Sequence, residues 1–178
     1  MPEQMNKPHA IIVMGVSGSG KSSVGEKIAE ALHLHFAEGD ALHPAANVEK
    51  MSKGTPLTDE DRMPWLDRIG EEIKASLEKG KGIIVSCSAL KRIYRDRLTT
   101  AAGGNLFFVY LEGSRALLTQ RMAERKGHFM PVSLLDSQLA TLEVPTGEQG
   151  VVSVDIDDTV EDIAANALKG LAALGITG

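Results

Sequence analysis

A glycine-rich stretch near the N-terminus holds the residue types best suited to chemistry. Residues 15–22 read Gly-Val-Ser-Gly-Ser-Gly-Lys-Ser, the pattern G-x-x-x-x-G-K-S. Its glycines let backbone N–H groups converge, and a following helix adds the positive end of its dipole, so such a loop binds phosphate. We expect Lys21 to reach the β- and γ-phosphates of a nucleotide and the Ser22 hydroxyl to bind Mg²⁺. The predicted nucleotide site comprises Gly15, Val16, Ser17, Gly18, Ser19, Gly20, Lys21, Ser22 and Ser23.

Asp40 is the acidic residue that we expect beside this loop. It follows residues 35–39, which are typical of a short strand, and we expect that strand to lie next to the one before the glycines. A carboxylate there would approach the γ-phosphate, where it could accept a proton from an attacking hydroxyl or help to hold Mg²⁺. A helix cap or an ordinary loop aspartate is the alternative. The segment from His43 to Trp65 is polar and irregular, and long segments of this kind are often functional.

Two pairs of basic residues, each four positions apart, predict cationic faces on helices. Lys91 and Arg95 follow a strand-like run at 82–87 and suit an anionic substrate, although a solvated helix face has the same spacing. Arg121 and Arg125 either complement a helix dipole or close over the phosphates. Because the run at 82–87 ends without the aspartate typical of GTPases and motor ATPases, a small-molecule kinase is favoured.

Strand-like and helix-like runs alternate along the chain, which predicts an open, parallel α/β sheet whose strand ends position these residues. Ala10–Met14, before the glycines, is a short apolar run with a β-branched centre. We expect the five strands over 10–14, 35–39, 82–87, 106–111 and 151–156. Helices are expected after the glycines, over 45–51, from a start at 58–61 and a second start at Pro64 to near Gly80, within 88–98, from Ser114 to near Gly127, over 132–142, and after a cap at Asp157 or Asp158.

The composition predicts one soluble domain over residues 1–178. The chain is 43% hydrophobic and 24% charged, and its length suffices for a substantial core. The net charge of −5 argues against nucleic acid or an anionic membrane as the main partner. We expect the single cysteine, Cys87, to be a buried, unreactive thiol. There is no signal-peptide pattern and no apolar run near the ~20 residues of a membrane span, so we expect a cytoplasmic protein.

Three further segments carry a family resemblance. They are His-Pro-Ala-Ala-Asn at 43–47, Pro-Leu-Thr-Asp-Glu-Asp-Arg-Met-Pro-Trp at 56–65 and Cys-Ser-Ala-Leu-Lys at 87–91. Together with the glycine-rich loop, Gly-His-Phe-Met at 127–130 and the stretch 137–143, they resemble the thermoresistant-type gluconokinases. That family belongs with the shikimate-kinase and nucleoside-monophosphate-kinase group of P-loop folds. The resemblance covers about residues 10–145.

The resemblance implies both an architecture and an activity. The implied fold has three αβα layers, a five-stranded parallel sheet of order 2-3-1-4-5, a substrate-binding segment over about 40–66 and a lid over about 115–145. The implied activity is ATP:D-gluconate 6-phosphotransferase, with ATP and Mg²⁺ as cofactors, D-gluconate as the small-molecule partner, and a homodimer. The implied catalytic residues are Lys21, Asp40, Arg121 and Arg125. The residues implied around the sugar acid are Asp40, His43, Asn47, Lys50, Asp61, Arg62, Ser88, Lys91, Arg95 and His128.

Two other functions stay open on the sequence alone. One is a kinase for another small hydroxy acid, such as shikimate. The other is a non-catalytic ATP-binding regulatory module, against which the intact Lys21, Ser22 and Asp40 argue. The base of the nucleotide is not placed by any motif, and the loop at 155–159 is chosen only for its position after a strand.

Overall fold

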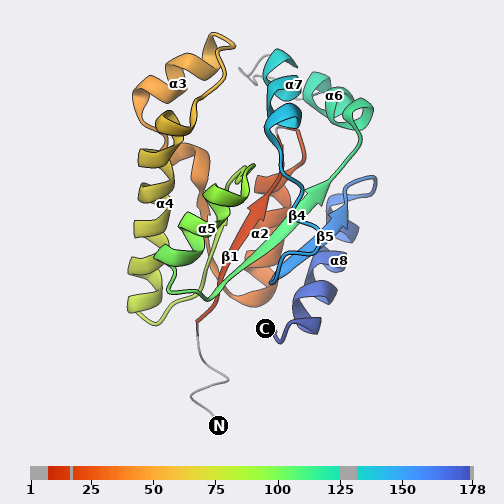
Figure 1. Cartoon of the computed structure of the whole chain (residues 1–178). Coiled ribbons are helices and arrows are strands. Elements are labelled where there is room, and N and C mark those ends of the chain that lie inside the picture. The colour runs from red at the N-terminus through yellow and green to blue at the C-terminus, as the bar shows by residue number, and fades with distance from the viewer. Residues whose placement is uncertain (1–7, 17, 125–131, 177–178) are drawn as a thin grey trace.

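A five-stranded parallel sheet forms the centre of the molecule (Figure 1). The computed structural model describes residues 8–16, 18–124 and 132–176. The strand order is β2-β3-β1-β4-β5, so the predicted sheet is confirmed. In chain order the strands are β1 (Ala10–Met14), β2 (His35–Glu38), β3 (Ile83–Ser86), β4 (Leu106–Glu112) and β5 (Val151–Asp155).

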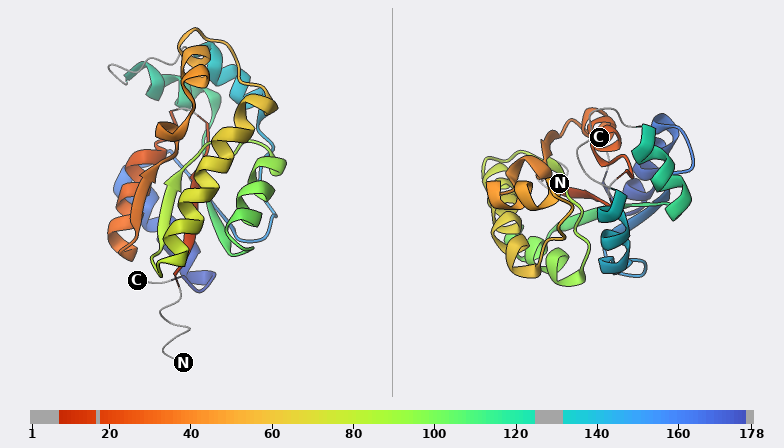
Figure 2. Two further views of the ribbon diagram at one scale, coloured as in Figure 1. Left: turned by 90° about the vertical axis from the view of Figure 1, so that its left-hand side faces the viewer. Right: turned by 90° about the horizontal axis from the view of Figure 1, so that it is seen from above.

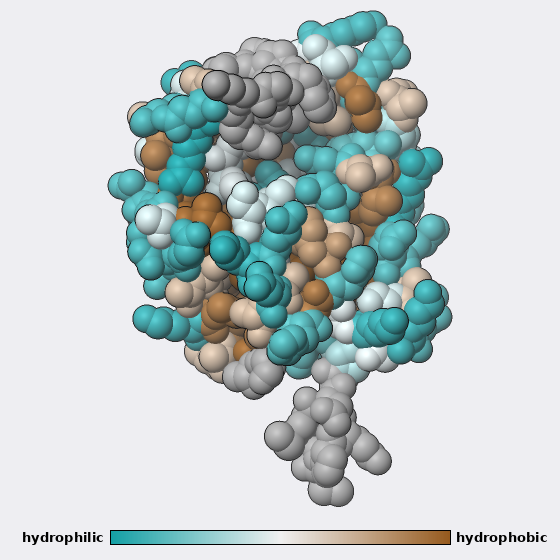
Figure 3. All heavy atoms as spheres, turned by 180° about the vertical axis from the view of Figure 1, so that it is seen from behind, coloured by the Kyte–Doolittle hydropathy of each residue, from teal (hydrophilic) through white to brown (hydrophobic). Residues whose placement is uncertain are grey.

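Helices cover both faces of the sheet and produce the three predicted layers (Figure 2). Helices α2 (Lys21–Leu32) and α8 (Val160–Ala173) pack on one face, whereas α4 (Asp59–Glu78) and α5 (Arg92–Ala101) pack on the other. Seen from behind, apolar residues on the surface are scattered among hydrophilic ones (Figure 3). Within the described ranges, no helix combines the length and apolar character that a membrane span requires.

The remaining helices gather beyond the carboxyl ends of the strands (Figure 1). They are α3 (Ala45–Ser52), α6 (Arg115–Glu124) and α7 (Val132–Thr141), and the short 3-10 helix η1 (Gly39–Leu42) leads from β2 towards them. This end of a parallel sheet is where ligands bind in α/β folds. The fold therefore places loops and short helices around the edge where the candidate residues were predicted.

The core explains why β1 is apolar throughout. All five of its residues are fully buried, because β3 and β4 flank it and helices cover both of its faces. Trp65, Ile69 and Ile73 of α4 belong to the same core. The Cys87 thiol is buried as predicted, and burial raises its pKa to about 12, so it stays protonated and unreactive.

Helix α4 corrects one prediction from the sequence. It is continuous from Asp59 to Glu78, so the second helix start expected at Pro64 is wrong. Thr58 and Asp61 form a reciprocal capping box that starts the helix. Pro64 is tolerated inside the helix because its missing N–H removes only one bond, close to the N-terminus.

The start of α8 corrects another prediction from the sequence. Thr159 is the N-cap, and its hydroxyl accepts a hydrogen bond from the Asp162 N–H at 3.1 Å. The predicted caps, Asp157 and Asp158, lie in the preceding turn, where the Asp158 carboxylate accepts from the Thr159 N–H instead. The predicted cap of α6 is confirmed, since the Ser114 hydroxyl accepts from the Leu117 N–H at 3.2 Å. The predicted end of that helix, near Gly127, lies outside the described residues.

Candidate active site

The glycine-rich loop runs from the carboxyl end of β1 to the N-terminus of α2. Gly18 and Gly20 have φ values of 84° and 89°, in the left-handed region that favours glycine. A Cβ on Gly18 would also lie 2.8 Å from the Met122 side chain, so a glycine there lets α6 pack against the loop. Helix α2 begins at Lys21, directly after the loop, so the N–H groups of its first turn border the loop. Ser17 lies outside the described residues.

The side chains of Lys21 and Ser19, at the end of the loop, point in different directions. The Lys21 ammonium donates to the Val16 carbonyl oxygen at 3.1 Å and lines a cavity in front of the loop. The Ser19 side chain is buried beneath the loop, close enough to Gly15 that a Cβ there would lie 2.8 Å from its hydroxyl. The Ser19 backbone N–H donates to the Val16 carbonyl at 3.3 Å, so both its backbone and its side chain serve the packing of the loop.

Glu38, the last residue of β2, is a site residue that the sequence patterns did not predict. The Ser22 hydroxyl lies 2.8 and 2.7 Å from the two Glu38 carboxylate oxygens. The Ser86 hydroxyl also donates to Glu38, at 2.5 Å, and accepts from the Gly39 N–H at 3.2 Å. Strand β3 ends in Ser86, but Glu38 is paired with it in register on the adjacent strand β2. Glu38 therefore supplies a carboxylate at the carboxyl end of β3.

This acidic group could hold a metal only together with a nucleotide. Throughout the part of the chain that the structure describes, no group of three or more His, Cys, Asp or Glu side chains could hold a metal ion. Ser22 and Glu38 nevertheless offer oxygen donors, and a hydroxyl that donates its proton to Glu38 keeps its lone pairs free for a cation. Mg²⁺ prefers this situation, in which few protein oxygens are combined with water and phosphate oxygens.

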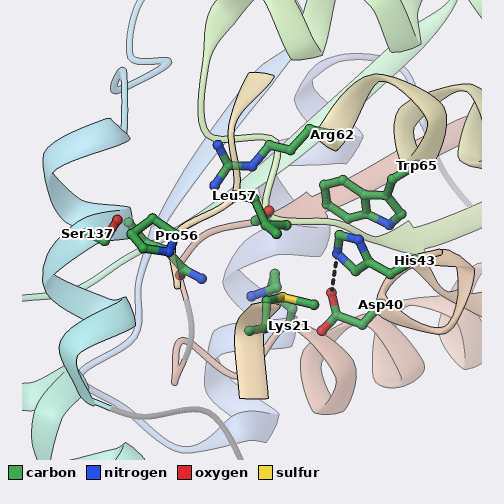
Figure 4. Close-up of a pocket in the computed structure, with 11 residues that line it drawn as sticks. Lys21, Asp40, His43, Pro56, Leu57, Arg62, Trp65 and Ser137 are labelled. Carbon is green, nitrogen blue, oxygen red and sulfur yellow. Dashed lines mark ion pairs between the residues drawn. The ribbon is translucent and has the colours of Figure 1, made fainter. Parts of the chain in front are cut away.

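Asp40 lies in η1, directly after β2, and one expectation about it is wrong. Strand β2 does not lie beside β1, because β3 separates them. Asp40 and Lys21 still line the same cavity, since η1 carries the chain across the end of β3 (Figure 4). The Gly39 backbone is anchored by Trp65, whose indole N–H donates to the Gly39 carbonyl at 2.8 Å.

His43 is held against Trp65 by stacking. The ring centroids are 4.0 Å apart and nearly parallel, and the imidazole Nε2 lies 4.0 Å from an Asp40 carboxylate oxygen (Figure 4). Burial, and secondarily the Arg62 guanidinium, lower the pKa of His43 to about 4, although Asp40 raises it. The imidazole is therefore neutral near pH 7, and it can exchange hydrogen bonds in the cavity without adding charge.

Asn47, Lys50 and Asp61 form a network behind His43. The Asn47 amide donates to the Asp61 carbonyl at 2.9 Å and lies 3.2 Å from His43 Nδ1. Lys50 pairs with the Asp61 carboxylate at 2.8 Å, and the Thr58 N–H donates to the same oxygen at 2.9 Å. These bonds, led by that of Lys50, lower the pKa of Asp61 to about 2. The three side chains brace α3 against the start of α4, and none of them lines the cavity itself.

Arg62 is the buried cation of the cavity. It is 7% exposed, and it donates to the Tyr94 hydroxyl at 3.0 Å, which in turn donates to Asp59. Lys91 pairs with the same Asp59 carboxylate at 2.9 Å and does not line the cavity. Tyr94 was not predicted, and burial together with its bond to Asp59 raises the pKa of its phenol. The cation that lines the cavity is therefore Arg62, and neither member of the predicted basic pair, Lys91 and Arg95, lines it.

The cavity joins residues from several helices and from the loops between them (Figure 4). Its volume is about 40 Å³, which is room for only a few water molecules. Of the predicted side chains it gathers Lys21, Asp40, His43, Arg62 and Ser88, whereas Met51, Pro56, Leu57, Trp65, Ser137 and Gln138 line it without having been predicted. A six-carbon acid would enter only if a wall moved, and α7 and the segment with Pro56 and Leu57 form the outer walls.

Two predicted arginines, Arg95 and Arg121, lie away from the cavity. Arg95 faces away from the cavity and pairs with Glu148. Arg121 donates to the Ile156 and Asp158 carbonyl oxygens, so it joins α6 to the loop that was chosen for the nucleotide base. Arg125 and His128 lie outside the described residues.

The chain matches proteins of known kind over most of its length. Residues 11–145 match a family model described as an AAA domain. The chain is 51% identical over 150 residues to a gluconokinase of Gluconobacter oxydans, covering 83% of each chain. It is 43% identical to the thermoresistant gluconokinase of Escherichia coli, covering 90% of this chain and 92% of that one.

Solved structures agree with this sequence similarity. The crystal structure of a gluconokinase from Sinorhizobium meliloti 1021 has a TM-score of 0.87 and 56% identity, and the match covers 94% of both chains. An APS kinase from Mycobacterium tuberculosis, in complex with AMPPNP and APS, has a TM-score of 0.69 and 18% identity. The second match shows that the fold is shared with other kinases.

Proposed function

The chain belongs to the gluconokinase family, and from this premise we propose that it transfers the γ-phosphoryl group of ATP to the 6-hydroxyl of D-gluconate. The observation that carries the proposal is the meeting of Lys21, Asp40 and Arg62 on one cavity. These are a phosphate-binding cation, a carboxylate and a buried guanidinium. Such a set suits an acceptor that bears a hydroxyl at one end and a carboxylate at the other.

Lys21 and Asp40 act on the two sides of the transferred group. Lys21 leaves the Val16 carbonyl for the phosphate oxygens and neutralises the charge that develops on them. Asp40 orients the acceptor hydroxyl and receives its proton as the new P–O bond forms. The neutral His43 beside Asp40 limits the positions of that carboxylate without cancelling its charge.

Arg62 binds the acceptor carboxylate from the buried side of the cavity. Its bond to Tyr94 fixes one edge of the guanidinium and leaves the other N–H groups for an anion. We assign Asn47, Lys50, Asp61 and Lys91 a supporting role in this wall. Ser88 and Gln138 line the same cavity and offer hydrogen bonds to sugar hydroxyls.

ATP is used with Mg²⁺ in this proposal, and Ser22 and Glu38 are the residues that would hold the ion. Mg²⁺ bound with ATP neutralises the β- and γ-phosphates. Glu38 keeps the Ser22 hydroxyl oriented through the two contacts described above. We further propose a cytoplasmic homodimer whose segment 115–145 closes over the nucleotide, with Arg121 and Arg125 on the closing segment.

Release of ADP across a panel of acids tests the assignment. D-gluconate should give the highest kcat/KM, with shikimate and other hydroxy acids at least tenfold lower, because Arg62 and the hydroxyl-binding groups fit one length of acid. If shikimate gave the highest kcat/KM, shikimate and not gluconate would be the substrate. Tight ATP binding without turnover of any acid would instead support the non-catalytic regulatory module.

A further inference from the structure

Arg95 is a buried cation with three separate partners. Its side chain is 2% exposed. Its guanidinium makes a two-bond contact to the Glu148 carboxylate, at 3.1 and 2.7 Å. It also donates to the Ala89 carbonyl at 2.8 Å and to the Glu143 carbonyl at 2.9 Å. One side chain of α5 thus joins the loop after β3 to the segment between α7 and β5.

Ala89 has a backbone conformation that needs such support. Its φ is +45°, in the left-handed region that is sterically unfavourable for a residue with a Cβ. The other non-glycine residue with positive φ in the described ranges is His33, which ends α2 as a C-cap, where this conformation is common. Ala89 ends no helix, and it is fully buried. The bond from Arg95 to its carbonyl is therefore an identifiable compensation for the strain.

The strained residue lies next to a wall of the cavity. Ser88 lines the cavity directly, and on the other side the Leu90 carbonyl accepts from the Glu143 N–H at 2.8 Å. The Glu143 carboxylate in turn accepts from the Arg92 N–H at 3.0 Å. Glu143 follows the end of α7, the helix that brings Ser137 and Gln138 to the opposite wall. Both walls are consequently tied to the Arg95 guanidinium.

We propose that Arg95 is a positioning residue for the acceptor substrate: it holds Ala89 in its left-handed conformation and fixes Ser88 and α7 on either side of the cavity. The inference rests on the proposed function, because the acceptor is taken to be gluconate. It replaces the direct substrate contact that the resemblance implied for Arg95. The two roles differ in a measurable way, since a positioning role acts through Ala89 and a contact does not.

Replacing Arg95 alone and together with Ala89 separates the two roles. Arg95→Met should raise the KM for gluconate by roughly 10-fold, because Ser88 and α7 would lose their fixed positions on the two walls, with the KM for ATP changed less than about twofold. Adding Ala89→Gly should recover a threefold or greater part of this loss, because glycine adopts positive φ without the Cβ cost. Arg97→Met is the matched control on the same helix: Arg97 pairs with Asp67 on the exposed surface, so it should leave both constants unchanged.

A second pair of variants covers the case in which Arg95→Met fails to fold, because it leaves Glu148 without its cation. Arg95→Lys keeps the charge but cannot reach three acceptors, and it should lie between wild type and Arg95→Met. Adding Ala89→Gly to Arg95→Lys should also lower the KM for gluconate. Absence of any recovery by Ala89→Gly in both backgrounds, or an equal rise in both KM values, would overturn the proposal in favour of direct contact or general damage.

Amide hydrogen exchange tests the anchor without any substrate. In Arg95→Lys the Glu143 amide, which bonds the Leu90 carbonyl, should exchange roughly 10-fold faster, whereas the Ile163 amide in α8 should not change. If the wild-type protein phosphorylated no gluconate but the Glu143 amide still responded, the proposed function would fail and the anchor would stand. An unchanged Glu143 amide would remove the anchor whatever the substrate.

Discussion

The phosphate end and the acceptor end of the cavity are stabilised in different ways. The glycine-rich loop is shaped mainly by backbone: left-handed glycines, the start of α2 and a buried strand before it. The acceptor end is shaped by side chains, among which Arg62, Tyr94 and Asp59 bond one another in sequence. A backbone site tolerates change in distant residues, whereas a side-chain network transmits the loss of one member to the others.

This difference predicts how substitutions divide between kcat and KM. Changes at the phosphate end should reduce the rate of transfer, because that end acts on charge that develops in the transition state. Changes at the acceptor wall should mainly weaken binding of the acid. Asp40 lies where the two ends meet and should show the largest effect.

Asp40→Asn should lower kcat by roughly 10²–10⁴-fold, the usual contribution of a positioned acid–base group. The amide keeps the size and one acceptor oxygen but removes the charge and the basicity. ATP affinity measured without Mg²⁺ should change little. Asp67→Asn is the matched control, since Asp67 pairs with Arg97 on the surface.

A Mg²⁺ titration of Asp40→Asn separates two roles for this carboxylate. Partial recovery of activity as Mg²⁺ rises would mean that Asp40 helps to hold the ion through water. No recovery is expected if Asp40 orients the acceptor hydroxyl. An unimpaired kcat at ordinary Mg²⁺ would exclude both roles. Asp40 would then not be the residue that links the phosphate end to the acceptor end.

Lys21→Ala should lower kcat by roughly 10²-fold, or about 3 kcal/mol of transition-state stabilisation. Its ammonium bonds a loop carbonyl and faces the cavity, so the melting temperature should be nearly unchanged. Lys27→Ala, on the same helix, removes an exposed lysine 3.7 Å from Glu161 and serves as the control. Near-normal turnover in a folded Lys21 variant would show that the loop is not the phosphate site.

Arg62→Ala should raise the KM for gluconate roughly 10- to 100-fold and the KM for ATP far less. Lys91→Ala should have a smaller effect on the KM for gluconate, because Lys91 pairs with Asp59 behind the wall. Arg68→Ala, also on α4, removes an exposed side chain bonded to a carbonyl and provides the control. A rise confined to the KM for ATP would assign Arg62 to the nucleotide end and remove the contrast between the two ends.

The same contrast explains what the sequence could predict. The phosphate loop is contiguous, so residues 15–22 and their flanking strand and helix predicted its position correctly. Glu38 was missed because its role depends on pairing with Ser86, 48 residues away, on a neighbouring strand. Tyr94 was missed because its partners Asp59 and Arg62 lie on another helix.

Arg95 shows the limit of helical spacing as evidence. Its four-residue separation from Lys91 suggested one basic face, but α5 begins only at Arg92, and Lys91 precedes it in an extended conformation. The two side chains therefore diverge: Lys91 reaches Asp59, and Arg95 reaches Glu148. Only the tertiary arrangement, and no local pattern, determines which cation faces the cavity.

The smallest expected effect concerns Asp61, which braces the acceptor wall from behind. Its carboxylate has a folded pKa of about 2, below the ordinary value of 3.8, because Lys50 and the Thr58 N–H bond its charged form. A group with a lowered folded pKa stabilises the protein above its unfolded pKa, and this stabilisation is lost as the pH falls through the folded value.

Asp61→Asn should thus lower the melting temperature slightly at pH 7, by less than about 3 °C, since the Lys50 pair is partly exposed. The difference from wild type should shrink between about pH 4 and pH 2. Glu49→Gln, which removes an exposed pair with Lys53, provides the control in scanning calorimetry. If the difference in melting temperature between wild type and Asp61→Asn stayed constant down to pH 2, Asp61 would act by packing and not through its charge. The ion pair with Lys50 would then not stabilise the acceptor wall.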